Sequence, residues 1–171
     1  MTVSNPYVNL AFTTIKSFYG DQVAKRSQVP LMNHIVEGLT ILDILDADFV
    51  TKAAYCLHPM LQSDKDFLEN KINSIPSSLI DAAILAMEYR RVANSYLSKD
   101  KITDFIGFSC QEVKNMLIAD KVQNYKDFLL YHKATHPRSQ ELDEYFNNWF
   151  ELLEISYNTI MSDLEEYLDQ K

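Results

Sequence analysis

Several features that define common enzyme classes are scarce or missing in this chain of 171 residues. It has three glycines and no glycine-rich segment, which excludes the loops that cradle phosphates in many nucleotide-binding proteins. It has no GxSxG segment, which argues against a hydrolase with a nucleophile elbow. No apolar run approaches the roughly 18 residues that a membrane-spanning helix requires, so we expect a globular protein without a membrane partner.

Cysteine is also scarce, and its placement bears on the compartment. Cys56 lies within an apolar helical pattern, and Cys110 has no second cysteine nearby that would complete a CxxC pair. Small secreted proteins that depend on disulfides have denser and more regular cysteine patterns. Residues 1–12 show no basic segment before an apolar one, as an export signal would. We therefore expect two reduced thiols and a cytoplasmic location.

Positive charge is scarce as well, since 16 Lys and Arg face 24 Asp and Glu and the net charge is −8. Nucleic acids and anionic membranes bind through clustered cations. We therefore expect no extended nucleic-acid surface. A small pocket with a few local cations would still suit a phosphorylated nucleotide.

Apolar residues, in contrast, are abundant and recur at three- and four-residue intervals through most of the chain. This spacing predicts an all-α protein, and the length fits a single domain over 1–171. The predicted helices are 6–19, 31–45, 48–61, 64–72, 77–97, 110–131 and 138–168. The acidic stretch 150–171 is expected to be a solvated amphipathic helix, with a contact in a homo-oligomer as the alternative.

Two of the four histidines lie on apolar helical segments. His34 is part of PLMNHIVEGL, and His58 follows AAYCL on the next predicted helix. Taken singly, each is typical of a hydrogen-bonded core residue. On neighbouring antiparallel helices the two could meet, and neutral imidazoles suit manganese, iron or zinc.

A metal site would also need a carboxylate, and Asp120 is the strongest candidate. It lies within the apolar segment MLIADKV, where an unpaired buried charge is costly. Its structural alternative is an ion pair with Lys121 or with an arginine of another helix. Two histidines and one carboxylate leave open positions for water and substrate, and a metal held there acidifies bound water.

The other two histidines, His132 and His136, have the spacing of one helix face. Pro137 predicts that the helix ends there, and no glutamate lies between them as in HExxH. We expect them to be solvated or to cap the helix.

Three segments in order resemble a known family. They are 22-QVAKRSQVPLMNH-34, 53-AAYCLHPMLQSD-64 and 117-LIADKVQNYKDFLLYHKATHPRSQELDEYFNNW-149. Together they resemble the small alarmone hydrolases, the hydrolase domain of the RelA/SpoT group in the HD phosphohydrolase superfamily. The resemblance implies an HD-type helical bundle and a Mn²⁺ cofactor. It also implies release of the 3′ diphosphate of guanosine tetra- or pentaphosphate, or of the 2′ phosphate of NADPH.

Carried residue by residue, the resemblance makes His34, His58 and Asp120 the metal ligands. It further implies five residues that contact the nucleotide, namely Lys25, Arg26, Lys121, Asn124 and Tyr145. The alternatives are that Lys25 and Arg26 belong to a solvated loop and that Tyr145 belongs to the core.

The sequence departs from this family where the chemistry is performed. The family's His-Asp pair reads 58-HP-59 here, and its Glu-Asp pair reads Gln62 and Ser63. A glutamine can position water but cannot accept its proton as a carboxylate does. The segment CLHP also resembles that of short proteins that include phage-encoded ones.

Other carboxylates could compensate for this loss. Glu37 shares a helix face with His34 and is a candidate ligand, with a solvated face as the alternative. Asp64 and Glu88 join Gln62 as candidate catalytic residues, although Glu88 could instead pair with Arg90 or Arg91. Two functions therefore remain open. One is a divergent metal-dependent phosphohydrolase, and the other is a catalytically inactive HD-type protein that binds a nucleotide or a protein partner.

Overall fold

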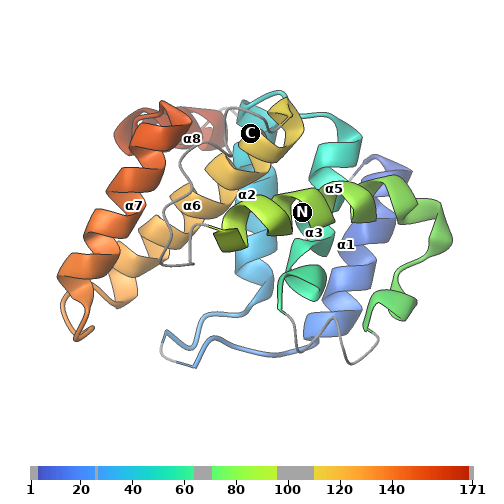
Figure 1. Cartoon of the computed structure of the whole chain (residues 1–171), viewed down its shortest axis with the longest axis horizontal. Coiled ribbons are helices and arrows are strands. Elements are labelled where there is room, and N and C mark those ends of the chain that lie inside the picture. Colours follow the sequence, from blue (N-terminus) through green and yellow to red (C-terminus); the bar gives the residue numbers. More distant parts are fainter. Residues whose placement is uncertain (1–3, 26, 64–70, 96–109, 170–171) are drawn as a thin grey trace.

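A computed structural model describes residues 4–25, 27–63, 71–95 and 110–169 of the chain (Figure 1). Within these ranges the chain forms α-helices and short 3-10 helices but no strand, which confirms the all-α prediction. The α-helices are α1 (Pro6–Tyr19), α2 (Met32–Ile44), α3 (Phe49–Gln62), α5 (Ile80–Ser95), α6 (Gln111–Tyr131), α7 (Ser139–Leu153) and α8 (Tyr157–Asp169). The 3-10 helices are η1 (Lys71–Ser74) and η2 (Ser77–Leu79).

Local sequence signals explain where the first helices begin. The Asn5 side chain accepts hydrogen bonds from the backbone N–H groups of Tyr7 and Val8 at 2.9 and 3.2 Å, and Pro6 follows as the first helical residue. In the same way, the Asp48 carboxylate accepts from the Thr51 N–H at 2.7 Å at the start of α3. Polar caps at these positions satisfy backbone donors that the helices themselves leave unpaired.

The single helix predicted over 138–168 is wrong, because the chain turns at Glu154 and forms α7 and α8 instead. Glu154 has φ 57°, a left-handed conformation that ends a helix. The Ile155 N–H then donates to the Phe150 carbonyl at 3.0 Å, which closes the end of α7. Of the predicted helix 64–72, residues 64–70 lie outside the described part of the chain.

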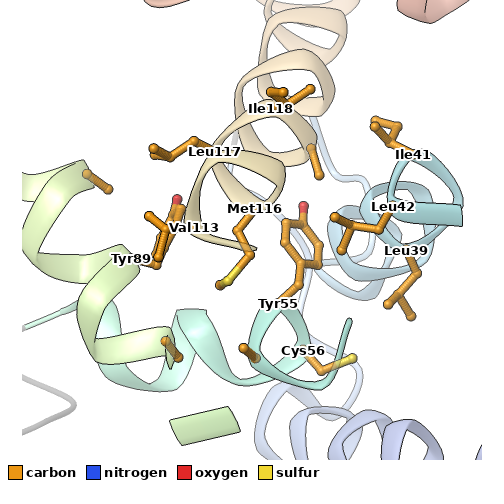
Figure 2. Close-up of a cluster of buried hydrophobic side chains, with 14 of the residues drawn as sticks. Leu39, Ile41, Leu42, Tyr55, Cys56, Tyr89, Val113, Met116, Leu117 and Ile118 are labelled. Carbon is orange, nitrogen blue, oxygen red and sulfur yellow. The ribbon is translucent and has the colours of Figure 1, made fainter. Parts of the chain in front are cut away.

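Helix α3 lies between α1 and α5 and also contacts α2 and α6 (Figure 1). Helix α6 packs against α2 and α5, while α7 packs against α6 and α8 against α2. Figure 2 shows Tyr55 of α3 and Tyr89 of α5 on either side of Met116 of α6 in the core. This packing brings together α2, α3 and α6, the helices that carry His34, His58 and Asp120.

A glycine allows the close approach of α2 to α3. A Cβ atom added to Gly38 would lie 2.1 Å from the hydroxyl oxygen of Tyr55, far inside van der Waals contact. Tyr55 is fully buried, so its ring is surrounded by other parts of the protein. Any larger residue at position 38 would therefore displace the tyrosine that lies beside His34.

Cys56 and Cys110 are both free thiols in the structure. Cys56 is buried in α3, and this burial raises the pKa of its thiol well above the ordinary value. In the described part of the chain, no helix combines the length and the apolar character needed to cross a membrane.

Candidate metal centre

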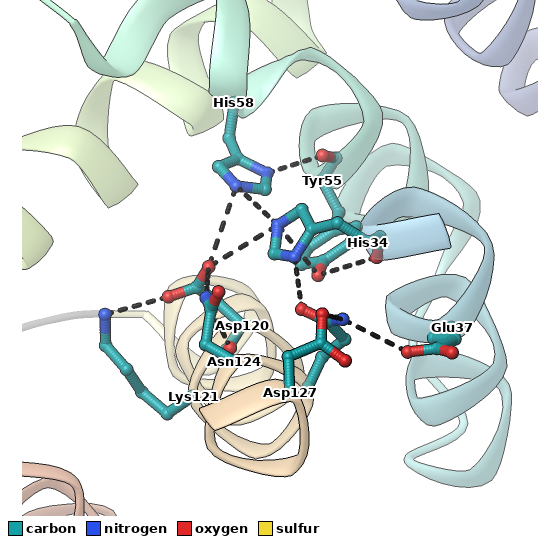
Figure 3. Close-up of polar contacts among 9 residues, drawn as sticks. His34, Glu37, Tyr55, His58, Asp120, Lys121, Asn124 and Asp127 are labelled. Atoms are coloured by element: carbon teal, nitrogen blue, oxygen red, sulfur yellow. Dashed lines mark hydrogen bonds and ion pairs between the residues drawn. The ribbon is translucent and has the colours of Figure 1, made fainter. Parts of the chain in front are cut away.

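Three side chains from three helices converge in the interior of the bundle (Figure 3). The His34 Nε2 atom lies 3.3 Å from the His58 Nε2 atom, and the Asp120 Oδ1 atom lies 3.5 Å from the first and 3.8 Å from the second. Among the described residues, these three form the one group of three or more His, Cys, Asp or Glu that could hold a metal ion. The three residues expected to be ligands are thus brought together.

The orientation of His58 follows from one short hydrogen bond. Its Nδ1 atom lies 2.6 Å from the backbone carbonyl oxygen of Tyr55, and a carbonyl can only accept a hydrogen bond. The proton is therefore on Nδ1, and the lone pair of Nε2 faces His34 and Asp120. Burial, followed by the neighbouring His34, lowers the pKa of His58 to about 3 although Asp120 opposes the shift. The ring is consequently neutral at pH 7.

The orientation of His34 is fixed by Gln123. The Gln123 Nε2 atom lies 3.1 Å from a Glu37 carboxylate oxygen and 2.9 Å from an Asp127 carboxylate oxygen, so it must be the donor of both bonds. The amide oxygen then faces the His34 Nδ1 atom at 2.6 Å and accepts a hydrogen bond from its N–H. In the neutral form of His34, the Nε2 atom then has a lone pair, as it does in His58.

Three electron-rich atoms therefore face one another at short range. Two imidazole lone pairs at 3.3 Å repel each other unless a cation lies between them. The Tyr55 hydroxyl is 3.4 Å from both the Nε2 atom and the backbone oxygen of His34, so its single proton is shared at a long distance. Nitrogen and oxygen ligands about 2.0–2.2 Å from an ion are roughly 3–3.6 Å apart, which is close to the spacing of these three atoms.

Asp120 is held by its neighbours in an ionised state. Its Oδ2 atom pairs with Lys121 Nζ at 2.8 Å, and its Oδ1 atom accepts from Asn124 Nδ2 at 2.8 Å. Burial alone would raise the pKa of the Asp120 carboxyl, but the Lys121 ammonium keeps it below its usual range. The ion pair expected as the structural alternative is thus present, and it leaves Oδ1 facing the histidines.

Aromatic rings hold the rest of the centre in place. The His58 ring lies between Tyr55 and Tyr89, with ring centroids 4.8 and 5.0 Å away. Lys121 lies over the Trp149 ring, with Nζ 5.0 Å from its centroid. These contacts keep water from the buried side of the centre, and only His34 is appreciably exposed.

A cleft of about 470 Å³ opens onto the three side chains, and we call it the main cleft. Most of its lining residues come from the loop before α2 and from α2, α3 and α6, and they include His34, His58, Pro59, Gln62, Asp120, Lys121, Gln123, Asn124 and Asp127. A second cleft of about 340 Å³ shares Lys121, Asn124 and His132 with it. The wall of the second cleft is aromatic, with Phe128, Tyr145 and Phe146.

The expected substrate-binding residues lie in different places. Lys121 and Asn124 line both clefts, and Tyr145 lines the second. The Asn124 amide is committed to Asp120, because it donates to both the Oδ1 atom and the backbone oxygen of that residue. Lys25 is exposed and is not among the residues that line the main cleft. Arg26 lies outside the described residues.

Glu88, a candidate catalytic carboxylate, is not among the residues that line the main cleft. Glu88 pairs with Arg91 through two hydrogen bonds on a solvent-accessible part of α5. Asp64 lies outside the described residues. Gln62 does line the main cleft, and its backbone oxygen accepts from the side chains of Arg90 and Asn94 at 3.3 and 3.2 Å.

Glu37, the fourth candidate ligand, is not part of the group of three. Its carboxylate pairs with Lys126 and accepts from Gln123. It therefore acts on the centre indirectly, because it helps to orient the amide that holds His34.

Sequence reasoning missed Gln123 and Tyr55, which orient the two histidines. Gln123 lies three residues after Asp120, and Tyr55 lies three residues before His58, so helical spacing places each pair on one face. That spacing was a usable signal. The hydrogen bond from His58 to the backbone carbonyl of Tyr55, however, cannot be predicted from residue type, because every residue has a backbone carbonyl.

Comparison of the chain with protein-family models, with curated proteins and with solved structures gives no significant match. The fold and the centre by themselves define the class, which is an all-α protein with a largely buried His–His–Asp group able to hold a metal ion.

Proposed function

We propose that the chain binds a divalent metal ion through His34, His58 and Asp120 and acts as a divergent HD-type phosphohydrolase on a phosphorylated nucleotide. One observation carries the proposal. Both histidines have their Nδ1 protons fixed by acceptors, so two lone pairs and an ionised carboxylate oxygen point at one position. Outer hydrogen-bond partners of this kind are what metal-binding histidines have in general.

A divalent ion such as Mn²⁺ would supply Lewis acidity toward a phosphoryl oxygen and would acidify a bound water. Three protein ligands leave positions open for that water and the substrate, and His34 faces the main cleft from which both would enter. Gln62 lines the same cleft and can position the water. It cannot take the proton, so the proposal assigns no general base to this residue.

The two clefts support a nucleotide as the substrate. The main cleft has the metal-binding group and Lys121, which suit phosphate, while the second cleft has an aromatic wall, which suits a base. Because Lys121 and Asn124 line both, a ligand could extend from one cleft into the other. Guanosine tetraphosphate and NADPH both have this shape, with phosphates on a sugar that bears a flat base.

A second function is favoured by the ion pair between Asp120 and Lys121. The ammonium lies 2.8 Å from the carboxylate and neutralises part of the charge that would attract a divalent ion. Together with Pro59 in place of the family's aspartate, this pairing suits a catalytically inactive protein that retains the clefts and binds a nucleotide without turnover.

The test begins with protein that has been freed of metal with a chelator. Titration with Mn²⁺ and Zn²⁺ is expected to show one site and a raised melting temperature, since a ligand at 100 times its Kd stabilises the folded state by about 2.7 kcal/mol. His34→Gln should abolish this response. His136→Gln, a matched change outside the group, should leave the response intact.

The loaded protein is then incubated with guanosine tetraphosphate, NADPH and deoxynucleoside triphosphates, and released phosphate or diphosphate is measured. Turnover of one of them, lost in His34→Gln, supports the phosphohydrolase. Nucleotide-dependent stabilisation without turnover supports the second function. Failure of the wild-type protein to bind either metal would contradict the metal centre.

A further inference from the structure

The residue after His58 is a proline inside a helix. Pro59 lies in α3, which continues to Gln62. A proline has no backbone N–H, so it cannot donate the hydrogen bond that residue 59 of an α-helix would make to the carbonyl of residue 55. The backbone carbonyl of Tyr55 is therefore left without its ordinary helical donor.

That same carbonyl is the acceptor that fixes the orientation of His58. The His58 Nδ1 atom donates to the Tyr55 oxygen at 2.6 Å, a short bond between buried groups. Both residues are at most 2% exposed, so little water can compete for either group. The Tyr55 carbonyl oxygen thus lacks its backbone donor and accepts from the His58 side chain instead.

We propose that Pro59 is a positioning residue for the metal centre. Because it withholds an N–H from the Tyr55 carbonyl, it reserves that oxygen for the Nδ1–H of His58. The imidazole is thereby held with its Nε2 lone pair toward His34 and Asp120. The inference rests on the proposed metal binding for its purpose, but the preferred tautomer of His58 can be tested without a metal.

The position of the proline is consistent with a role beyond shaping the helix. A proline in a helix interior lowers helix stability, and such local costs are typical of functional sites. Pro59 lines the main cleft beside His58, and its ring is half-buried rather than packed in the core. A residue with an N–H at this position would share the Tyr55 carbonyl, which has two lone pairs, and would weaken the bond to His58 rather than abolish it.

The decisive variant is Pro59→Ala, in which the backbone donor returns and the ring is removed. We expect its melting temperature to rise, because alanine suits a helix interior. We also expect its affinity for Mn²⁺ or Zn²⁺ to fall about tenfold, the lower end of the range for lost outer-shell partners. Nitrogen NMR of the metal-free protein should show His58 as the Nδ1–H tautomer in the wild type and as a mixture of tautomers in the variant.

Pro76→Ala is the matched control, since Pro76 precedes η2 and does not line the main cleft. It should change neither the tautomer of His58 nor the metal affinity. A wild-type His58 protonated at Nε2 would overturn the proposal. So would a Pro59→Ala protein that is more stable but has the same tautomer and affinity, because the proline would then be only structural. If the wild type binds no metal, the proposed function fails, yet the tautomer measurement still decides the role of Pro59.

Discussion

The two pairs of histidines in this protein differ in what surrounds them. His34 and His58 are 24 residues apart in the sequence, yet their Nε2 atoms lie 3.3 Å apart between helices. His132 and His136 are four residues apart at the end of α6, where the backbone N–H of His136 donates to the His132 carbonyl at 2.8 Å. Only the first pair is grouped with a carboxylate in the described part of the chain.

The difference lies in the nitrogen that each ring has available. In the first pair, Nδ1 donates to a fixed acceptor and Nε2 is left to face Asp120. In His136, the Nδ1 atom is an acceptor of the Arg138 backbone N–H at 3.1 Å, so a lone pair is used within the turn. The hydrogen-bond partner of each imidazole ring is therefore a better indicator of metal binding than the spacing of the two histidines along the chain.

The largest effect is expected from Asp120→Asn, which removes the charge but keeps the shape of the side chain. Metal affinity should fall at least about 100-fold, since a charged ligand is lost. The metal-free protein should lose about 3–5 kcal/mol of unfolding free energy, because Lys121 is left buried without its carboxylate. Urea denaturation and metal titration measure the two effects.

The double variant Asp120→Asn with Lys121→Met is the control for this result. It removes both charges, so it should recover most of the lost stability while metal affinity stays as low as in the single variant. Equal instability of the single and double variants would show that the ion pair is not what Asp120 contributes to folding.

A smaller effect is expected from pH in the metal-free protein. The pKa of His58 is lowered to about 3, mainly by burial, from an ordinary value near 6.5, so between these values the unfolded state binds more protons than the folded state. Unfolding free energy should therefore fall as pH falls below 6.5, with a slope of up to about 1.4 kcal/mol per pH unit. Asp120 does not contribute above about pH 5, because its own pKa is lowered and the carboxylate is ionised in both states.

Urea midpoints between pH 7 and pH 5 check this prediction. The variant His58→Gln should show a flatter profile, and His132→Gln should retain the wild-type slope. A wild-type profile that is flat over this interval would mean that His58 takes up a proton as readily in the folded as in the unfolded chain.

The smallest effect is expected from the second pair. The double change His132→Gln with His136→Gln should alter unfolding free energy by no more than about 0.5 kcal/mol, as surface substitutions usually do. Its metal affinity should stay within about twofold of the wild type. If the double variant lost as much metal affinity as Asp120→Asn, the metal would bind at His132 and His136, and the two pairs would not differ as described.

Much of the fold follows from local patterns. Apolar spacing predicts the helices that became α1, α2, α3 and α6 to within a few residues, and the polar caps Asn5 and Asp48 explain where α1 and α3 begin. The break at Glu154 was missed because a glutamate gives no turn signal, although Glu154 has a left-handed conformation and the next residue, Ile155, packs against the core. The similarity to the HD phosphohydrolases stays a prediction.

The sequence by itself determined that the chain is helical, that its thiols are unpaired and that His34, His58 and Asp120 are polar residues on otherwise apolar segments. These properties depend on residue type and on spacing within single helices. Only the tertiary structure decided that the three side chains meet and that Gln123 orients the first histidine. It also decided that the Glu37 carboxylate accepts a hydrogen bond from Gln123 and is not part of the metal-binding group. The physical reason is that hydrogen-bond direction depends on the positions of atoms from different helices, and the packing of α2, α3 and α6 sets those positions.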